Sequence, residues 1–204
     1  MHYAHTAKRT FSQYLSDQRV TFELGHLATP FEIDPSVEIR HARQVSMGSN
    51  CVVRARTILN GRSNREPFGV RLGENTYIKE GCYIDAYGGF VNIAGYCAFG
   101  QNAFIHGGGG VTIGKYVIAG PSTCIIASNH RYGSIELPTM LQGDRCEGIR
   151  IGNNVWLGSF VIVLDGVTIG DNAVVGAGTI VTRDVPPGSL IYNQLPLQVS
   201  SAFT

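Results

Sequence analysis

The chain has 204 residues and a net charge of +1 at pH 7, with 44% hydrophobic and 15% charged residues. This composition is typical of a globular protein and excludes a collagen-like or disordered chain. A nearly neutral chain has no overall field that would attract nucleic acid or an anionic membrane, so we expect neither as a partner.

The first thirty residues lack the repeat that organises the rest of the chain, and we expect residues 1–30 to form an N-terminal cap. Phe11, Tyr14 and Leu15 have the spacing of one face of a short helix that would cover the first coil. No signal-type apolar run occurs here, and no membrane-spanning apolar stretch occurs anywhere in the sequence. The prediction is therefore a cytoplasmic protein without stable membrane insertion.

The cysteine pattern is also what we expect of a cytoplasmic protein. The five cysteines are odd in number and form no C-x-x-C pair, at positions 51, 82, 97, 124 and 146. This pattern argues against a disulfide framework and against a zinc ribbon. We expect reduced thiols that are mostly buried, and no metal requirement.

From residue 31 an apolar residue recurs every six positions, starting with Ile33, Ile39, Val45 and Cys51. An irregular segment, 57–71, follows these early hexads. Arginine is concentrated in both parts, because seven of the thirteen arginines fall there, at 40, 43, 54, 56, 62, 65 and 71.

The next hexads come in groups of three. Their first residues are Leu72, Ile78 and Ile84, then Ile93, Phe99 and Ile105, then Ile113, Ala119 and Ile125. The steps between groups are longer, with extra residues at 88–92, 107–112 and 131–150. All three insertions therefore fall at the same corner of the repeat, the usual place for function on a solenoid.

The last hexads are the most regular, and each begins with an aliphatic residue: Ile151, Leu157, Val163, Ile169, Val175 and Val181. The second residue is mostly glycine, which we interpret as a bend residue that tolerates positive φ. The fifth is small or β-branched, which favours a short strand. Three strands would close a coil of eighteen residues, and stacked coils would give an all-β, parallel β-helix over residues 31–190 with a tail at 191–204.

The stretch 151–187 reads IGNNVWLGSFVIVLDGVTIGDNAVVGAGTIVTRDVPP and resembles the hexapeptide-repeat acyltransferases of the galactoside and maltose O-acetyltransferase type. SNHRYG at 128–133 looks like their catalytic-histidine segment, and Gln142-Gly143 is similar to relatives that O-acetylate capsule and lipopolysaccharide sugars. The resemblance covers roughly residues 70–190. It implies a left-handed β-helix, a homotrimer with active sites between subunits, and acetyl-CoA as acyl donor in polysaccharide biosynthesis.

His130 is the candidate base. It closes the last hexad before the long insertion, and imidazole titrates close to working pH. Direct transfer is expected because no cysteine or serine has a recognisable nucleophile setting, and Cys124 is expected to pack.

The resemblance assigns oxyanion and thioester contacts to the backbone around Gly158 and Ser159. It assigns CoA contacts to Trp156, Ser159, Ala177, Thr182 and Arg183. The ending departs from the family pattern, since Leu195, Pro196, Leu197 and Gln198 stand where relatives carry a basic Pro-Ala-Lys-like stretch.

Three further residues are acceptor candidates. Asp85 and His106 occupy equivalent hexad positions two coils and one coil from His130, and Asn102 is a weaker candidate. The arginine-rich segment predicts an anionic acceptor, with a solvated face paired to Glu38, Glu66 and Glu74 as the alternative.

Four other functions compete. N-acetylation of an amino sugar, often nucleotide-linked, needs the same base. A β-helix carbonic anhydrase needs three zinc histidines, whereas His106 and His130 have no second histidine nearby. A non-catalytic solenoid would leave the insertion 131–150 unexplained. Serine acetyltransferase requires a large helical N-terminal domain that thirty residues cannot hold.

Overall fold

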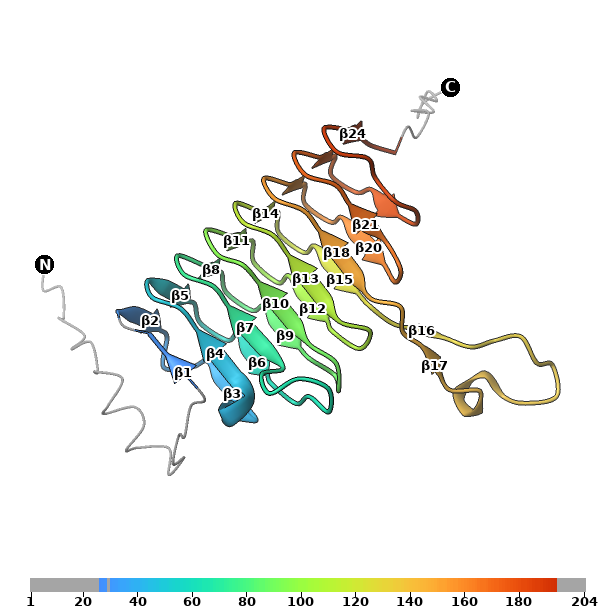
Figure 1. Cartoon of the computed structure of the whole chain (residues 1–204), viewed down its shortest axis with the longest axis horizontal. Helices are drawn as coiled ribbons and strands as arrows, with labels where there is room; N and C mark the ends of the chain where they lie inside the picture. Colours follow the sequence, from blue (N-terminus) through green and yellow to red (C-terminus); the bar gives the residue numbers. More distant parts are fainter. Residues whose placement is uncertain (1–25, 29, 194–204) are drawn as a thin grey trace, which may run out of the picture.

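The computed structural model describes residues 26–28 and 30–193. Three parallel sheets wind around a common axis as a solenoid of stacked triangular coils (Figure 1). This confirms the predicted all-β, parallel β-helix. The predicted N-terminal helix with Phe11, Tyr14 and Leu15 lies outside the described residues, as does most of the tail 191–204. The first strand, β1, already pairs with β4 ahead of the predicted boundary at residue 31.

The chain visits the sheets in a fixed order, which we call A, B and C. Sheet A consists of β1 (His26–Leu27), β4 (Val45–Met47), β7 (Val70–Leu72), β10 (Val91–Ile93), β13 (Val111–Ile113), β18 (Ile149–Ile151) and β21 (Thr168–Ile169). Sheet B consists of β2 (Phe31–Ile33), β5 (Cys51–Val53), β8 (Tyr77–Ile78), β11 (Ala98–Phe99), β14 (Ile118–Ala119), β19 (Trp156–Leu157), β22 (Val174–Val175) and β24 (Leu190–Ile191). Sheet C consists of β3 (Glu38–Arg40), β6 (Ile58–Asn60), β9 (Tyr83–Asp85), β12 (Phe104–His106), β15 (Cys124–Ile126), β20 (Ile162–Leu164) and β23 (Ile180–Val181).

The first residues of the regular hexads fill the interior. Each lies above its equivalent in the next coil, as Ile93 pairs with Ile113 and Ile105 with Ile125. All of those predicted from Leu72 to Val181 are buried. The column of aliphatic side chains that results is the hydrophobic core, and its burial is the main favourable term in the folding of the coil stack.

Two predicted first residues of the early hexads, Val45 and Cys51, are wrong. The strand register aligns Met47 with Leu72 and Val53 with Ile78, so Met47 and Val53 are the first residues of the two hexads that follow Ile39. Two extra residues fall in the short 3₁₀ helix η1 (Ala42–Gln44), between β3 and β4. The hexad count could not detect them because Val45 and Met47 alternate along a strand, point the same way and are both buried.

The glycines at the second hexad position also have a different role from the predicted one. Gly158 and Gly170 do not have positive φ; the left-handed residues are in the fourth position, as at Asn154 and Asn172. A Cβ on Gly158 would lie 2.6 Å from the backbone nitrogen of Ala177 in the next coil. These glycines therefore permit close stacking of successive coils, and the bend itself is made by the fourth residue.

Every insertion leaves the solenoid between sheets C and A, and we call this edge the loop corner. The three predicted insertions emerge there, after β9, β12 and β15. Two more emerge at the same corner: 41–44, which the hexad count did not reveal, and 61–69, which lies within the segment 57–71 that is irregular in sequence. The segment 57–71 thus contains two regular strands, β6 and β7, on either side of one loop.

The longest insertion forms an arm. β16 (Asn129–His130) pairs antiparallel with β17 (Asp144–Arg145), and the chain between them projects from the coil stack (Figure 1). A 3₁₀ helix, η2 (Thr139–Leu141), lies on the returning side of the arm, shortly before β17 (Figure 1). The Gln142 side chain closes the outer loop of the arm, because its Nε2 donates to the carbonyl oxygens of Ser134 and Leu137.

Candidate functional site

His130 lies at the base of the arm, where β16 leaves the loop corner. Its Nδ1 is 2.7 Å from Oδ1 of Asp144, and its side chain is 70% exposed. Asp144 faces His130 directly in the antiparallel pair β16–β17. A carboxylate that accepts from Nδ1–H fixes the ring and leaves Nε2 free toward solvent. Sequence analysis missed Asp144, since only the hairpin register brings it to His130.

A row of polar side chains runs from His130 toward the N-terminal coils. Ser128 Oγ lies 3.2 Å from Nδ1 of His106, one coil away. The His106 ring lies against the Tyr87 ring with centroids 4.1 Å apart. Burial lowers the pKa of His106, while the charges of Asp85 and Asp144 act in the opposite direction. His106 is thus a partly buried group between His130 and the next coil.

Asp85 is the buried carboxylate of this row, with 5% of its surface exposed. It accepts hydrogen bonds from the Tyr87 backbone N–H, at 2.7 Å, and from the Tyr83 hydroxyl, at 3.0 Å. The register places Asp85 beside His106, and His106 beside Ile126. The predicted proximity of Asp85 and His106 is therefore present in the structure.

A cavity of about 350 Å³ opens on the far side of Asp85. The end of β6 and loop 61–69 supply one part of its wall, and the end of β9 with the corner that follows supplies the other. Its lining consists of Asn60, Arg62, Asn64, Asp85, Tyr87 and Gly88.

The residues expected to contact the acyl donor fall in two places. Gly158, Ser159 and Ala177 lie at the corner between sheets B and C, and Trp156 lies beside them on sheet B with 57% of its surface exposed. Thr182 and Arg183, in contrast, follow β23 at the loop corner. Sheet C separates the two corners, so one chain does not bring Ser159 to His130.

The backbone around Gly158 offers one of the two expected donors. The Gly158 N–H already donates to the carbonyl oxygen of Val175 at 2.8 Å. The Ser159 N–H has no hydrogen-bond acceptor among the residues the structure describes. Asn102, the weakest acceptor candidate, lies at this same corner with φ of 58°, away from Asp85 and His106.

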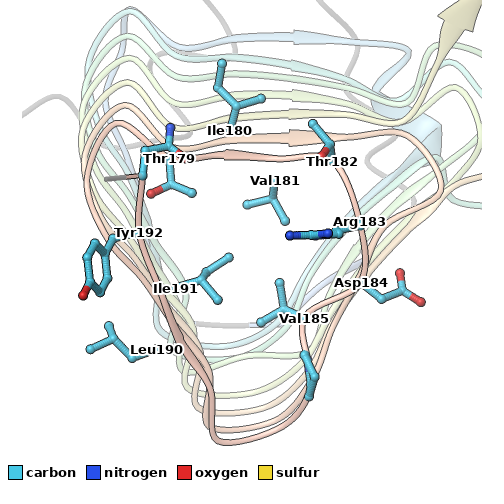
Figure 2. A pocket seen from close by; sticks show the side chains of 12 residues that line it. Thr179, Ile180, Val181, Thr182, Arg183, Asp184, Val185, Leu190, Ile191 and Tyr192 are labelled. Atoms are coloured by element: carbon cyan, nitrogen blue, oxygen red, sulfur yellow. The ribbon is translucent and has the colours of Figure 1, made fainter. Parts of the chain in front are cut away.

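A larger cavity, of about 710 Å³, lies at the C-terminal end of the solenoid and contains Thr182 and Arg183 in its lining. Val181, Val185 and Ile191 point into it (Figure 2). These are core positions of the last coil. The cavity is thus the open end of the solenoid, and it lies on the far side of β20 from His130.

The cysteine thiols are free, and Cys51, Cys82 and Cys97 are buried as predicted. Burial raises the pKa of Cys82 to about 11 and also raises the pKa of Cys124. Neither thiol is therefore poised as a thiolate nucleophile.

Within residues 26–28 and 30–193, no group of three or more His, Cys, Asp or Glu side chains is arranged to hold a metal ion. The described part of the chain also has no helix long and apolar enough to cross a membrane.

A parallel solenoid whose coils are each built from three six-residue units is the architecture of the hexapeptide-repeat proteins. A family model for the bacterial transferase hexapeptide, with six repeats, matches residues 148–183. The Staphylococcus aureus (strain COL) protein named "Putative acetyltransferase SACOL2570" is 30% identical over 185 residues, which cover 88% of this chain and 78% of that protein. The chain belongs to the hexapeptide-repeat acetyltransferase family.

Two further similarities are more limited. Galactoside O-acetyltransferase of Escherichia coli (strain K12) is 38% identical over 117 residues, and the match spans 57% of this chain and 56% of that enzyme. A crystal structure of a variant of AntD, an N-acyltransferase from Bacillus cereus, in complex with dTDP and coenzyme A, aligns with a TM-score of 0.59 and 16% identity. It covers 85% of this chain and 81% of AntD, and at this identity it shows the shared fold alone.

Proposed function

We propose that this acetyltransferase moves an acetyl group from acetyl-CoA to a sugar hydroxyl, with His130 as general base. The observation that carries the proposal is the exposed His130 ring, held through Nδ1 by Asp144 at the loop corner. Nε2 takes the hydroxyl proton as the oxygen attacks the thioester carbonyl carbon. The C–S bond then breaks, and the proton passes from Nε2 to the departing sulfur.

The developing oxyanion needs a hydrogen-bond donor, and the Ser159 N–H supplies it. Gly158 serves differently, because its own N–H is engaged by Val175 and its missing side chain leaves room for the thioester. Trp156 and Ala177, near Ser159, border the groove that takes the pantetheine arm, and Arg183 pairs with CoA phosphate.

The active site requires a second copy of the chain, because sheet C holds His130 and Ser159 apart within one. The outward first residues of the sheet C strands from β6 to β23 are mostly apolar, namely Ile58, Tyr83, Phe104, Cys124, Ile162 and Ile180. The outward residues of the sheet A strands from β4 to β21 are polar, namely Ser46, Arg71, Asn92, Thr112, Arg150 and Thr168. A closed threefold ring with sheet C toward its axis buries the apolar face. It also places the loop corner of each subunit beside the corner between sheets B and C of the next subunit, where Ser159 lies.

N-acetylation of an amino sugar is the second candidate, and AntD, which shares the fold, is an N-acyltransferase. The same base serves an amine, so His130 does not separate the two reactions. A panel of sugars and amino sugars, free and nucleotide-linked, assayed for thiol release from acetyl-CoA, decides between them.

His130→Ala tests the mechanism. The expected result is a loss of acetyl transfer of about a hundredfold or more, with fold and oligomeric state retained, because a positioned base contributes about 10²- to 10⁴-fold. Cys124→Ser is the matched control and keeps most of the activity. Turnover near the wild-type rate in His130→Ala, or an acetyl adduct trapped on Cys124, contradicts the proposal.

A further inference from the structure

The cavity beside Asp85 is not used by the chemistry at His130, and its lining has a specific character. It combines two amides, Asn60 and Asn64, with the Arg62 guanidinium and the Asp85 carboxylate. Amides and a carboxylate can donate to and accept from the hydroxyls of a sugar ring, while a guanidinium suits an oxyanion. Tyr87, 55% exposed, supplies an amphipathic wall.

The cavity is built by a fixed loop. The Gly88 N–H donates to Arg62 O at 2.9 Å, and the Asn64 N–H donates to Gly88 O at 3.0 Å. Gln44 clamps the backbone of Ser63 from the neighbouring coil, with its Nε2 2.9 Å from Ser63 O and its Oε1 3.2 Å from Ser63 N. Loop 61–69 is therefore held in place before any ligand arrives, which limits the entropy lost on binding.

Two cations of this loop lack a neutralising partner among the described residues, and one of them, Arg62, lines the cavity. Arg62 and Arg65 are exposed, and neither forms an ion pair with a residue that the structure describes. Burial raises the pKa of Cys146, just after β17, and the charges of Asp165 and Asp144 act in the same direction, whereas the charge of Arg65 opposes them. The charge of Arg65 thus acts toward the base of the arm.

The cavity and His130 belong to one continuous row. From Arg62 the row passes Tyr87, the His106 ring and Ser128 before it reaches His130. Asn60 ends β6 and Arg62 follows it, and β6 lies three strands from β15 in sheet C. Neighbouring strands are about 4.8 Å apart, so the row is about 14 Å long. A single sugar ring cannot span this length.

We infer that the acceptor is an elongated anionic glycoside, with the acetylated hydroxyl at His130 and a phosphate or carboxylate held by Arg62 about 14 Å away. The inference rests on the proposed function and deepens it. Asp85 and the two asparagines bind sugar hydroxyls between the two ends. Bidentate pairing with the oxyanion supplies the selectivity for charge.

The test compares matched acceptors in the thiol-release assay at low salt. A neutral disaccharide, cellobiose, is set against a uronate disaccharide, digalacturonate, and free glucose against UDP-glucose. Corresponding amino sugars are included. The expected result is a kcat/KM at least about tenfold higher for the anionic members, declining as salt screens the charges. The uronate and nucleotide pairs distinguish carboxylate from phosphate.

Arg62→Ala should raise the KM of the anionic acceptors about tenfold and leave the KM values of acetyl-CoA and the neutral acceptors unchanged. Arg150→Ala is the matched control, because it removes the same charge from the exposed middle of β18 on sheet A, away from the proposed interface. Equal kcat/KM for neutral and anionic acceptors, or an Arg62→Ala variant that behaves like Arg150→Ala, overturns the inference and leaves the proposed function standing.

If no acceptor is acetylated, the proposed function is wrong, and the inference about the anion site is tested separately by ligand binding. Calorimetric titration of the CoA-saturated protein with inorganic pyrophosphate and with digalacturonate should then show binding that Arg62→Ala weakens about tenfold. Absence of binding by both ligands, or equal binding by both proteins, overturns it.

Discussion

Asp144 and His130 have different roles at the loop corner. Asp144 does not touch substrate in the proposed mechanism; it holds the ring of His130 through Nδ1. Such positioning partners of a histidine typically contribute about 10- to 100-fold where they have been removed. Removal of Asp144 should lower kcat and not raise KM, because the ring orientation matters in the transition state and not for the binding of either substrate.

Asp144→Asn should therefore lower kcat by about tenfold or more while both KM values stay within twofold. Asp144→Glu should recover part of the loss, which a purely structural role would not predict. Steady-state kinetics with thermal melting as the control give the answer. An unchanged kcat in Asp144→Asn removes Asp144 from the mechanism.

His106 gives the protein a pH-dependent term in its stability. Because burial lowers its pKa in the folded state from 6.5, the unfolded chain binds the proton more readily. The neutral ring therefore contributes stability that is present above the unfolded pKa and is lost as the pH falls below it. Melting temperatures measured from pH 7.5 to 5.5 should fall less in His106→Gln than in the wild type. Parallel curves contradict this role.

At the scale of the elements, the coil stack depends on residues without side chains. A Cβ on Gly100 would lie 2.4 Å from the backbone nitrogen of Pro121, and backbone cannot move aside as a flexible side chain can. Gly100→Ala should lower the melting temperature by about 5 °C, corresponding to about 1–3 kcal/mol of overpacking. Gly133→Ala, where a Cβ has nothing within 4 Å, is the control and should melt like the wild type. Equal melting temperatures for Gly100→Ala and the wild type contradict the stacking argument.

The regular coils could be predicted from the sequence because each needs one large aliphatic residue at a fixed position. The same count failed at residues 41–47, where Val45 and Met47 both point inward and either fits the pattern. It also gave the second-position glycines the wrong role, because a periodicity does not show which atoms of the next coil lie nearby. His130 could be placed at the loop corner, but Asp144 could not, since no repeat relates the two sides of the arm.

At the scale of the whole molecule, the proposed trimer can be tested separately from catalysis. Phe104 lies in the middle of the apolar face of sheet C, stacked on Tyr83 with ring centroids 5.7 Å apart. Phe104→Lys places a charge in the proposed interface, where its desolvation opposes association. Light scattering should shift from three times the 22.0 kDa chain mass to a single chain mass, with loss of acetyl transfer.

Thr112→Lys is the matched control, since Thr112 is the exposed middle residue of β13 on the polar face of sheet A. This variant should remain trimeric and active. Circular dichroism establishes that both variants keep the β-helix. A wild-type protein that scatters as a single chain while fully active refutes the trimer.

The uniform stacking of the coils makes the site adjustable only in fixed steps. Every insertion leaves at the loop corner, so the spacing between His130 and Ser159 along the axis depends on the number of whole coils between them. One extra eighteen-residue coil before Ile149 would move Ser159 by about 4.8 Å relative to His130, too far for a shared reacting group. One added after Thr168 would move only Ala177, Thr182 and Arg183. The distance from His130 to the thioester contacts and the distance to the nucleotide end of CoA can therefore change only by whole coils, and each can change without the other.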